Sequence, residues 1–232
     1  MYNPAEASLD SYTAGICLAP VLPGITIVGR WLEPDIWRLN MIYLVGGAPR
    51  SGKSILGQQI SAKLKIGWIS TDLLVELLRV KNVEGVPLEW NATPEAIAAT
   101  ADWFFPCLER FIWRLTEMVD SYLIEGVGFL PGQIEQLSAH YPIRTVFLGC
   151  SKMTFERFDN FPGRSPGYAF LPEEMRRQFA QDIPLWSEFV RREAGRFGYP
   201  YVDMSNDFHL RLSEADALLT ADVFPEGRGS EQ

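Results

Sequence analysis

The fold is decided by one stretch of the sequence, Gly47-Ala48-Pro49-Arg50-Ser51-Gly52-Lys53-Ser54. Its two glycines let the backbone turn tightly and approach a ligand without a Cβ in the way. The successive backbone N–H groups of such a loop point inward and attract anions, and a following helix adds the positive end of its dipole. Lys53 is expected to reach the β- and γ-phosphates of a nucleotide, and the Ser54 hydroxyl to bind Mg²⁺. We therefore predict that all eight residues line a nucleotide-binding loop.

The residues on either side of this loop are those that a functional phosphate loop requires. Residues 41–45 form a continuous apolar run, which is typical of a central parallel strand buried on both faces. Residues 52–64 then follow a helical pattern. The eight-residue pattern can also occur by chance, but a buried strand before it and a helix after it favour the functional interpretation.

Beyond the loop, short apolar runs alternate with longer helical patterns. Further strands are expected at residues 66–70, 121–125, 145–148 and 199–204. Further helices are expected at residues 72–80, 94–119, 132–139, 152–158, 172–197 and 210–219. Connections long enough for a crossover predict a mostly parallel, five-stranded sheet that is covered by helices on both faces. We assign residues 41–224 to this single α/β domain and residues 225–232 to a polar tail.

The composition argues against several classes of protein. With 47% hydrophobic and 22% charged residues, the 232-residue chain has the composition of an ordinary soluble globular protein. Its formal net charge of −8 argues against a nucleic-acid partner. No apolar run reaches the roughly 18 residues of a membrane span. Three widely spaced cysteines and two histidines offer no metal-binding cluster. These features favour a cytoplasmic protein.

The first forty residues differ from the rest of the chain because they are rich in Pro and Gly and show weak periodicity. Met41 then opens directly into the first predicted strand. One hypothesis is that residues 1–40 are an added arm, or translated upstream sequence with Met41 as the natural start. The alternative is a loop and a short edge hairpin packed on the sheet, which Trp31 and Trp37 favour.

Two acidic residues follow predicted strands, at the edge of the sheet where open α/β folds bind their ligands. Asp72 comes after strand 66–70 and is suited to accept the proton of a substrate hydroxyl or to hold Mg²⁺ through water. Its alternative role is an N-cap for the next helix. Glu125 ends the strand at 121–125, where an acid that orients a metal ion is expected. Its alternative is a surface acid without a function.

A Gly- and Pro-rich segment at about 158–172 follows the fourth predicted strand and is interpreted as a small lid. Phosphoryl transfer needs positive charge over the moving group, and arginines on a mobile lid usually supply it. Arg157 and Arg164 lie in or beside this segment. We predict that they close over the transferring group, and the alternative is a helix with a solvated charged face.

Three stretches carry a resemblance to a known group: residues 43–54, Ser70-Thr71-Asp72 and Ile124-Glu125-Gly126-Val127. They resemble the P-loop small-molecule kinases related to 2-phosphoglycerate kinase and, more distantly, zeta-toxin-like, adenylate and shikimate kinases. The resemblance covers about residues 41–219. It implies a three-layer P-loop NTPase fold with strand order 2-3-1-4-5, ATP with Mg²⁺ as donor, and a lid after the fourth strand. It also implies Asp72 as a substrate-side acid and Arg157 as a phosphate clamp.

One position departs from this group. Several relatives carry a basic residue three positions after the aspartate to hold the substrate, whereas this sequence has Val75. Arg79 is then the next candidate for a substrate contact. The identity of the acceptor, 2-phosphoglycerate included, does not follow from the sequence.

Together these residues predict an ATP-dependent kinase that transfers the γ-phosphoryl group to a hydroxyl or phosphate of a small metabolite. Lys53 would stabilise the phosphates, and Ser54 with Glu125 or Asp72 would organise Mg²⁺. The alternatives are a nucleotide-binding regulatory module with slow ATPase activity and a polynucleotide-kinase-like enzyme. A GTPase is disfavoured because the second half of the chain has no Asn-Lys-x-Asp motif.

Overall fold

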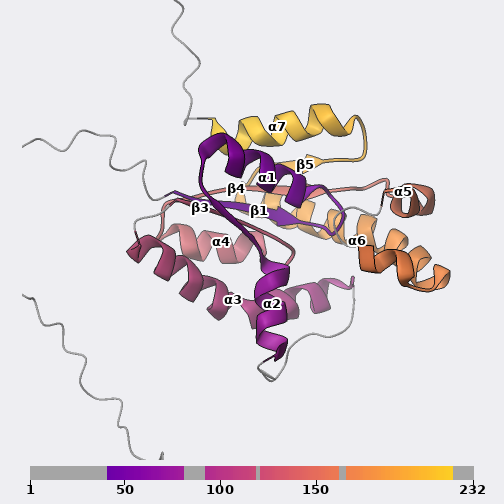
Figure 1. Cartoon of the computed structure of the whole chain (residues 1–232), viewed down its shortest axis with the longest axis horizontal. Helices are drawn as coiled ribbons and strands as arrows, with labels where there is room; N and C mark the ends of the chain where they lie inside the picture. The colour runs from indigo at the N-terminus through magenta and orange to yellow at the C-terminus, as the bar shows by residue number, and fades with distance from the viewer. Residues whose placement is uncertain (1–40, 81–91, 119–120, 162–165, 222–232) are drawn as a thin grey trace, which may run out of the picture. The chain divides into compact units, whose positions relative to one another are not determined.

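The chain folds around a sheet of five parallel strands in the order β2-β3-β1-β4-β5 (Figure 1). The structure is a computed structural model that describes residues 41–80, 92–118, 121–161 and 166–221. The strands are β1 (Ile42–Gly47), β2 (Gly67–Ser70), β3 (Tyr122–Glu125), β4 (Ile143–Gly149) and β5 (Tyr201–Asp203). The predicted fold class and strand order are confirmed.

The helices are α1 (Lys53–Leu64), α2 (Thr71–Val80), α3 (Pro94–Glu117), α4 (Pro131–Ser138), α5 (Phe155–Asn160), α6 (Glu173–Phe197) and α7 (Phe208–Thr220). Each was expected from the sequence, with ends that differ by a few residues. The short 3₁₀ helix η2 (Pro166–Phe170) was not. Strand β5 is shorter than expected, and Pro200 directly before it has no N–H to donate to a neighbouring strand.

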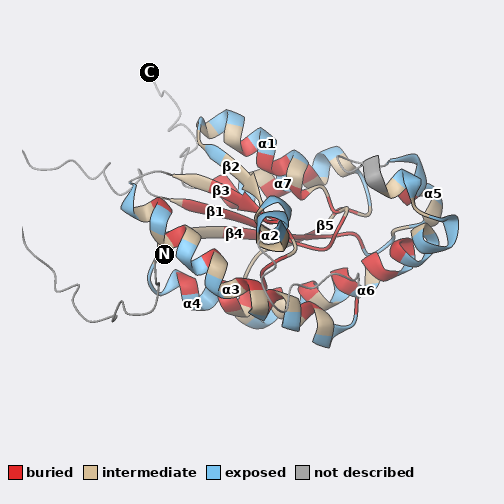
Figure 2. Ribbon diagram, turned by 60° about the horizontal axis from the view of Figure 1, so that its bottom comes forward, coloured by how far each residue is buried: buried red, intermediate tan, exposed pale blue. Residues whose placement is uncertain are grey.

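The two faces of the sheet are covered by different helices (Figures 1 and 2). Helices α1 and α7 cover one face, where Tyr43 and Val45 of β1 share a core with Leu56. Helices α3, α4 and α6 cover the other face, toward which Ile42 and Leu44 point. All six residues of β1 are buried. The continuous apolar run of this strand is therefore explained by a core on each side of it.

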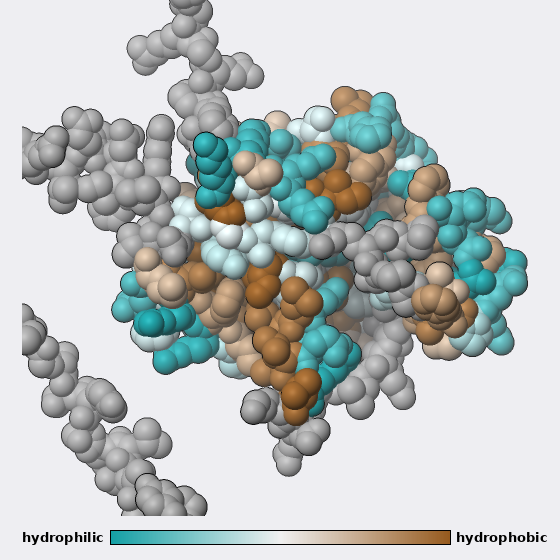
Figure 3. Space-filling view, viewed as in Figure 1, coloured by the Kyte–Doolittle hydropathy of each residue, from teal (hydrophilic) through white to brown (hydrophobic). Residues whose placement is uncertain are grey.

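Helix α2 carries an apolar ridge on its outer side. The exposed fractions of Leu73, Leu77 and Val80 are 59%, 65% and 78%. Their spacing of four and three residues places them on one face of the helix. Figure 3 shows apolar side chains gathered over α2. These three side chains are thus left outside the two cores.

The parallel arrangement brings five chain segments to one edge of the sheet, because the carboxyl ends of all five strands meet there. The Gly-rich loop follows β1, Asp72 follows β2, and Gly126 follows β3. The segments after β4 and β5 begin at Cys150 and Met204. This edge is where the candidate functional residues are found.

Some predictions fall outside the described residues. These are the arm at 1–40, the tail at 225–232, and Arg164 within the proposed lid. In the part of the chain that the structure describes, no helix is both long enough and apolar enough to cross a membrane.

Candidate functional site

The phosphate loop has a backbone that requires glycine at two positions. Gly47 and Gly52 have φ angles of 125° and 93°, in the region that favours glycine. A Cβ on Gly47 would lie 1.9 Å from the carbonyl oxygen of Leu148, which is a backbone atom of the neighbouring strand. Gly52 is the N-cap of α1, and its carbonyl accepts the N–H groups of Ile55 and Leu56 at 3.0 Å each. The loop is therefore fixed between the sheet and the first turn of α1.

Lys53 is the first residue of α1, and only 7% of it is exposed. Its Nζ donates to the carbonyl oxygen of Ala48 at 2.6 Å, so the ammonium group lies against the inside of the loop. Burial lowers the pKa of this ammonium, whereas the carboxylates of Glu125 and Asp72 act to raise it. Both predicted acids thus lie close enough to Lys53 to act on its charge.

Ser54 and Glu125 are 71 residues apart in sequence and are hydrogen-bonded in the structure. The Ser54 hydroxyl donates to Oε1 of Glu125 at 2.9 Å. Glu125 is the last residue of β3 and is 2% exposed, and its partner in the β1 register is Val45. The two residues predicted for the metal site are therefore brought together by the pairing of β1 with β3.

These two oxygen-bearing side chains fit Mg²⁺, which in nucleotide sites is usually held by one or two protein ligands together with phosphate oxygens and water. No group of three or more His, Cys, Asp or Glu side chains that could hold a metal occurs among the described residues. The described residues therefore contain no metal site made by such side chains alone. They are compatible with a metal site that a bound nucleotide completes.

Asp72 lies in the first turn of α2 and is exposed. Its backbone N–H donates to Ser70 Oγ at 3.4 Å. Burial raises the pKa of the Tyr168 phenol, and the charge of Asp72 raises it further. Asp72 therefore acts electrostatically on Lys53 at the phosphate loop and on Tyr168 of η2.

Arg79 is at the other end of α2, where it forms an ion pair with Glu76 on the same helix. Seven residues at 1.5 Å per residue separate Asp72 and Arg79 by about 10 Å along the helix axis. The structure does not bring these two candidate substrate residues together.

Arg157 lies on α5 and binds the segment that follows β5. Its guanidinium donates to the carbonyl oxygens of Met204 and Ser205, each at 2.8 Å. Asp203 stabilises the same segment by accepting hydrogen bonds from the backbone N–H groups of Ser151 at 3.1 Å and Ser205 at 3.0 Å. Burial alone would raise the pKa of Asp203, but hydrogen bonds from these two serines hold it below its usual value.

Thr71 was not predicted as a site residue; it is 1% exposed and lies beside Gly126 in the loop after β3. Its Oγ1 has no hydrogen-bond partner among the described residues. A Cβ on Gly126 would lie 1.7 Å from this oxygen, so the close approach of the two segments requires glycine there. The motif Ser70-Thr71-Asp72 contains this threonine, but its burial has no signal in the residue pattern.

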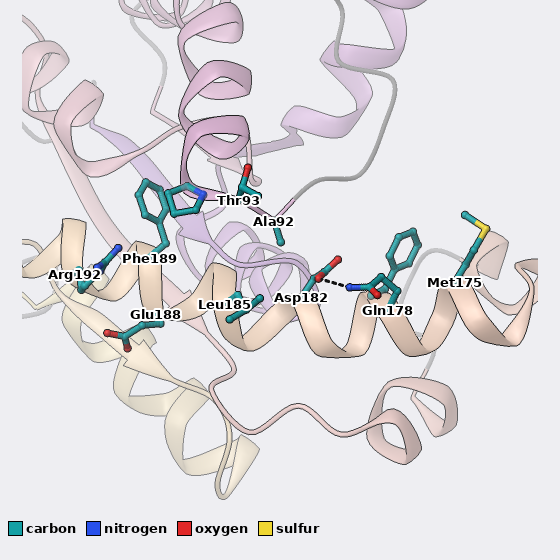
Figure 4. A pocket seen from close by; sticks show the side chains of 11 residues that line it. Ala92, Thr93, Met175, Gln178, Asp182, Leu185, Glu188, Phe189 and Arg192 are labelled. Atoms are coloured by element: carbon teal, nitrogen blue, oxygen red, sulfur yellow. Dashed lines mark hydrogen bonds between the residues drawn. The ribbon is translucent and has the colours of Figure 1, made fainter.

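A cavity of about 680 Å³ lies between the start of α3 and α6 (Figure 4). Its walls are mainly apolar, but Asp182 of α6 is 8% exposed and accepts a hydrogen bond from Gln178 Nε2 at 2.9 Å. Phe179, another lining residue, packs edge-on against Tyr168 with ring centroids 5.7 Å apart. The cavity wall is thus in contact with η2, on which Asp72 acts. The sequence pattern shows α6 as a charged helix and does not reveal this cavity.

No family model and no curated protein sequence matches the chain. Among solved structures, a gluconokinase from Sinorhizobium meliloti 1021 is 21% identical, with a TM-score of 0.50 over 79% of this chain and 93% of that chain. A shikimate kinase from Aquifex aeolicus is 18% identical, with a TM-score of 0.43 over 80% and 99% of the two chains. One from Bacteroides thetaiotaomicron is 14% identical, with a TM-score of 0.41 over 79% and 97%. At 21% identity the likeness to the gluconokinase is one of fold alone.

Proposed function

We propose that the protein is a small-molecule kinase that transfers the γ-phosphoryl group of ATP, in the presence of Mg²⁺, to a hydroxyl or phosphate of a metabolite. The observation that carries this proposal is the Ser54–Glu125 hydrogen bond directly beside the buried Lys53. A phosphate loop, a hydroxyl and a carboxylate in this arrangement supply the charges that a nucleotide triphosphate with its metal ion needs.

The phosphate loop binds the β- and γ-phosphates through its backbone N–H groups and Lys53. In the structure the Lys53 ammonium donates to the carbonyl of Ala48. A phosphate oxygen carries more negative charge than a carbonyl and would compete for the same ammonium. The loop residues from Gly47 to Ser54 then surround the phosphates, and Glu125 and Asp72 help to keep Lys53 protonated.

Mg²⁺ would be held by Ser54 and Glu125, with phosphate oxygens and water as its other ligands. The ion neutralises charge on the β- and γ-phosphates when it is bound. Glu125 is buried and bonded to Ser54, so the chain itself fixes the orientation of both oxygens.

Asp72 orients the acceptor and receives the proton of its hydroxyl group. Two observations support this role: its side chain is exposed, and its charge acts on Lys53. Arg79 is about two helical turns away along α2 and would contact an acceptor only at its far end. Arg157 and Arg164 provide positive charge over the transferring group, Arg157 from α5.

Within the P-loop kinases we place the chain near the group related to 2-phosphoglycerate kinase and zeta toxins, in the cytoplasm. The stretches Ser70-Thr71-Asp72 and Ile124-Glu125-Gly126-Val127 support this placement. Both stretches end strands at the edge that carries the phosphate loop. The segment around 158–172 is proposed as the lid.

The proposal is tested by a transfer screen with γ-labelled ATP and a metabolite extract, comparing the wild type with Asp72→Asn. We expect labelled product with the wild type, and loss of product in the variant while ATP still binds. Release of ADP that no metabolite pool accelerates, together with a conformational change on nucleotide binding, would indicate a regulatory module instead. Unchanged transfer by Asp72→Asn would remove the proposed role of Asp72.

A further inference from the structure

Arg50 is an unusual residue in the phosphate loop. Its φ angle is 61°, in the region where non-glycine residues are uncommon. An arginine here carries a conformational cost that its side-chain contacts must offset. The backbone N–H group of Arg50 belongs to the loop. The contacts of its side chain indicate a second role.

The guanidinium of Arg50 reaches out of the phosphate loop to α5. It donates to the carbonyl oxygen of Phe158 at 2.9 Å and also to that of Phe161. It lies 4.6 Å from the centroid of the Phe158 ring and 5.7 Å from that of Tyr168. These distances are within the range of a cation–π contact.

Both carbonyl groups belong to the C-terminal end of α5, which has only six residues. A helix this short has little stability of its own. Its last carbonyls have no partner within the helix, and its C-terminus favours a positive charge. At the other end, Thr154 Oγ1 accepts the Arg157 N–H at 3.2 Å. The cap at the C-terminal end of α5 is therefore provided by a residue 108 positions away in sequence from Phe158.

Helix α5 is thereby attached at two points of the sheet edge. Arg50 connects it to the phosphate loop, and Arg157 connects it to the carbonyls of Met204 and Ser205 after β5. Tyr168 lies between Phe158 and Phe179, with ring centroids 6.1 and 5.7 Å away. The contacts of Arg50 are therefore continuous with η2 and with the wall of the cavity beside α6.

We propose that Arg50 is a positioning residue that caps α5 from within the phosphate loop and so holds Arg157 and Tyr168 in place for phosphoryl transfer. The role in positioning Arg157 and Tyr168 for transfer rests on the proposed kinase function. Its structural part, the capping of α5, is independent of the function. A change in the phosphate loop would be transmitted to α5 through the Arg50 side chain.

The test compares the wild type with Arg50→Gly, Arg50→Lys and the control Arg177→Gln. Glycine adopts a φ of 61° without strain, so Arg50→Gly removes the side chain and leaves the loop backbone intact. Arg177 also contacts α5, with its guanidinium 3.9 Å from the Phe155 ring, but it comes from α6 and not from the phosphate loop. Amide hydrogen exchange is measured on the nucleotide-free proteins, ADP·Mg²⁺ affinity by calorimetry, and turnover with ATP.

We expect the amides of Phe158 and Phe161 to exchange about tenfold faster or more in Arg50→Gly, because charge-assisted hydrogen bonds to the helix end are lost. ADP·Mg²⁺ affinity should stay within about threefold while kcat falls about tenfold or more, since the loop is kept and the positioning is lost. Arg50→Lys should recover part of both effects because it restores one charge. Arg177→Gln should change neither exchange nor kcat by more than about twofold.

Unchanged exchange at α5 in Arg50→Gly would overturn the capping. An ADP affinity that falls as far as kcat would overturn the positioning role, because the loop itself would then be damaged. If the wild type phosphorylates no acceptor, the proposed function fails, and the exchange data still decide whether Arg50 caps α5. In that case kcat is measured as the hydrolysis of ATP without an acceptor, for the wild type and for each variant.

Discussion

The Ser54–Glu125 pair and helix α5 are placed by different means, although both lie at the same edge of the sheet. Ser54 and Glu125 meet because β1 and β3 are neighbouring strands in a fixed register. Helix α5 is held by side-chain contacts. Arg50 and Arg157 each bind backbone carbonyls of another segment. In addition, Asp159 pairs with Arg176 of α6, and Phe158 is buried in a core cluster with residues of α6. The first arrangement depends on the sheet, and the second on a few side chains. The pair should therefore withstand changes in the surface of the protein that would displace α5.

The largest effect is expected where the sheet meets the phosphate loop. Gly47→Ala would place a Cβ 1.9 Å from the Leu148 carbonyl oxygen at a φ of 125°, and should cost about 3 kcal/mol of unfolding free energy or more. Nucleotide binding should be lost with it. Urea unfolding and ATP titration measure both effects.

Gly195→Ala is the matched control for this change. Gly195 lies in α6, and a Cβ there would meet no atom within 4 Å. Alanine should stabilise the helix by about 0.5–1 kcal/mol. If Gly47→Ala had the same unfolding free energy as this control, the loop would not depend on its close contact with β4.

Glu125→Gln should remove the Mg²⁺ dependence of ATP binding, because the amide keeps an oxygen near Ser54 but loses the charge. Turnover should fall about a hundredfold, as expected for the loss of a metal ligand. Glu125 raises the pKa of Lys53, so its loss should also move the alkaline limb of the pH–rate profile to lower pH. An unchanged limb would show that Glu125 does not support the charge of Lys53.

Arg157→Gln would separate α5 from the segment after β5. The guanidinium makes two hydrogen bonds to carbonyls, so a loss of about 1.5–3 kcal/mol in unfolding free energy is expected. The hydrogen bond between Ser54 on α1 and Glu125 at the end of β3 does not involve Arg157, so this pair should still bind Mg²⁺ with ADP. Thermal unfolding of Arg157→Gln is measured with and without ADP·Mg²⁺. If ADP·Mg²⁺ no longer raised the Tm of this variant, the Ser54–Glu125 pair would not be independent of α5.

The smallest effect is expected at Arg79, which forms an ion pair with the exposed Glu76 on the same helix. Arg79→Gln should change the unfolding free energy by about 0.5 kcal/mol or less. If an acceptor reaches this end of α2, its KM should rise while that of ATP stays the same. Equal KM values for wild type and variant would remove Arg79 from the substrate site.

The residue pattern predicted the sheet and the two acids that follow its strands. These features have strong local signals, because a buried parallel strand is continuously apolar and a phosphate loop has a fixed pattern. Glu125 or Asp72 was expected to act with Ser54, because the carboxyl ends of parallel strands meet at one edge. The structure pairs Ser54 with Glu125. The resemblance to known kinases supplied the strand order, which periodicity does not contain.

The contacts of Arg50, the burial of Thr71 and the cavity beside Asp182 could not be predicted in the same way. Each depends on a side chain meeting a distant segment, and such a meeting leaves no periodic pattern. The interpretation of Arg157 as a phosphate clamp came from the resemblance to known kinases. The hydrogen bonds to Met204 and Ser205 depend on where β5 ends, which the sequence predicted less accurately.

The 71-residue separation of Ser54 and Glu125 also bears on how the protein folds. Long-range contacts of this kind form late, because the chain between them must be ordered before they are made. The Ser54–Glu125 pair therefore does not exist until β1 and β3 have paired, and the proposed nucleotide site is complete only after that step. A nucleotide would stabilise only the native state, so the appearance of nucleotide binding during refolding would report the moment at which the central sheet is assembled.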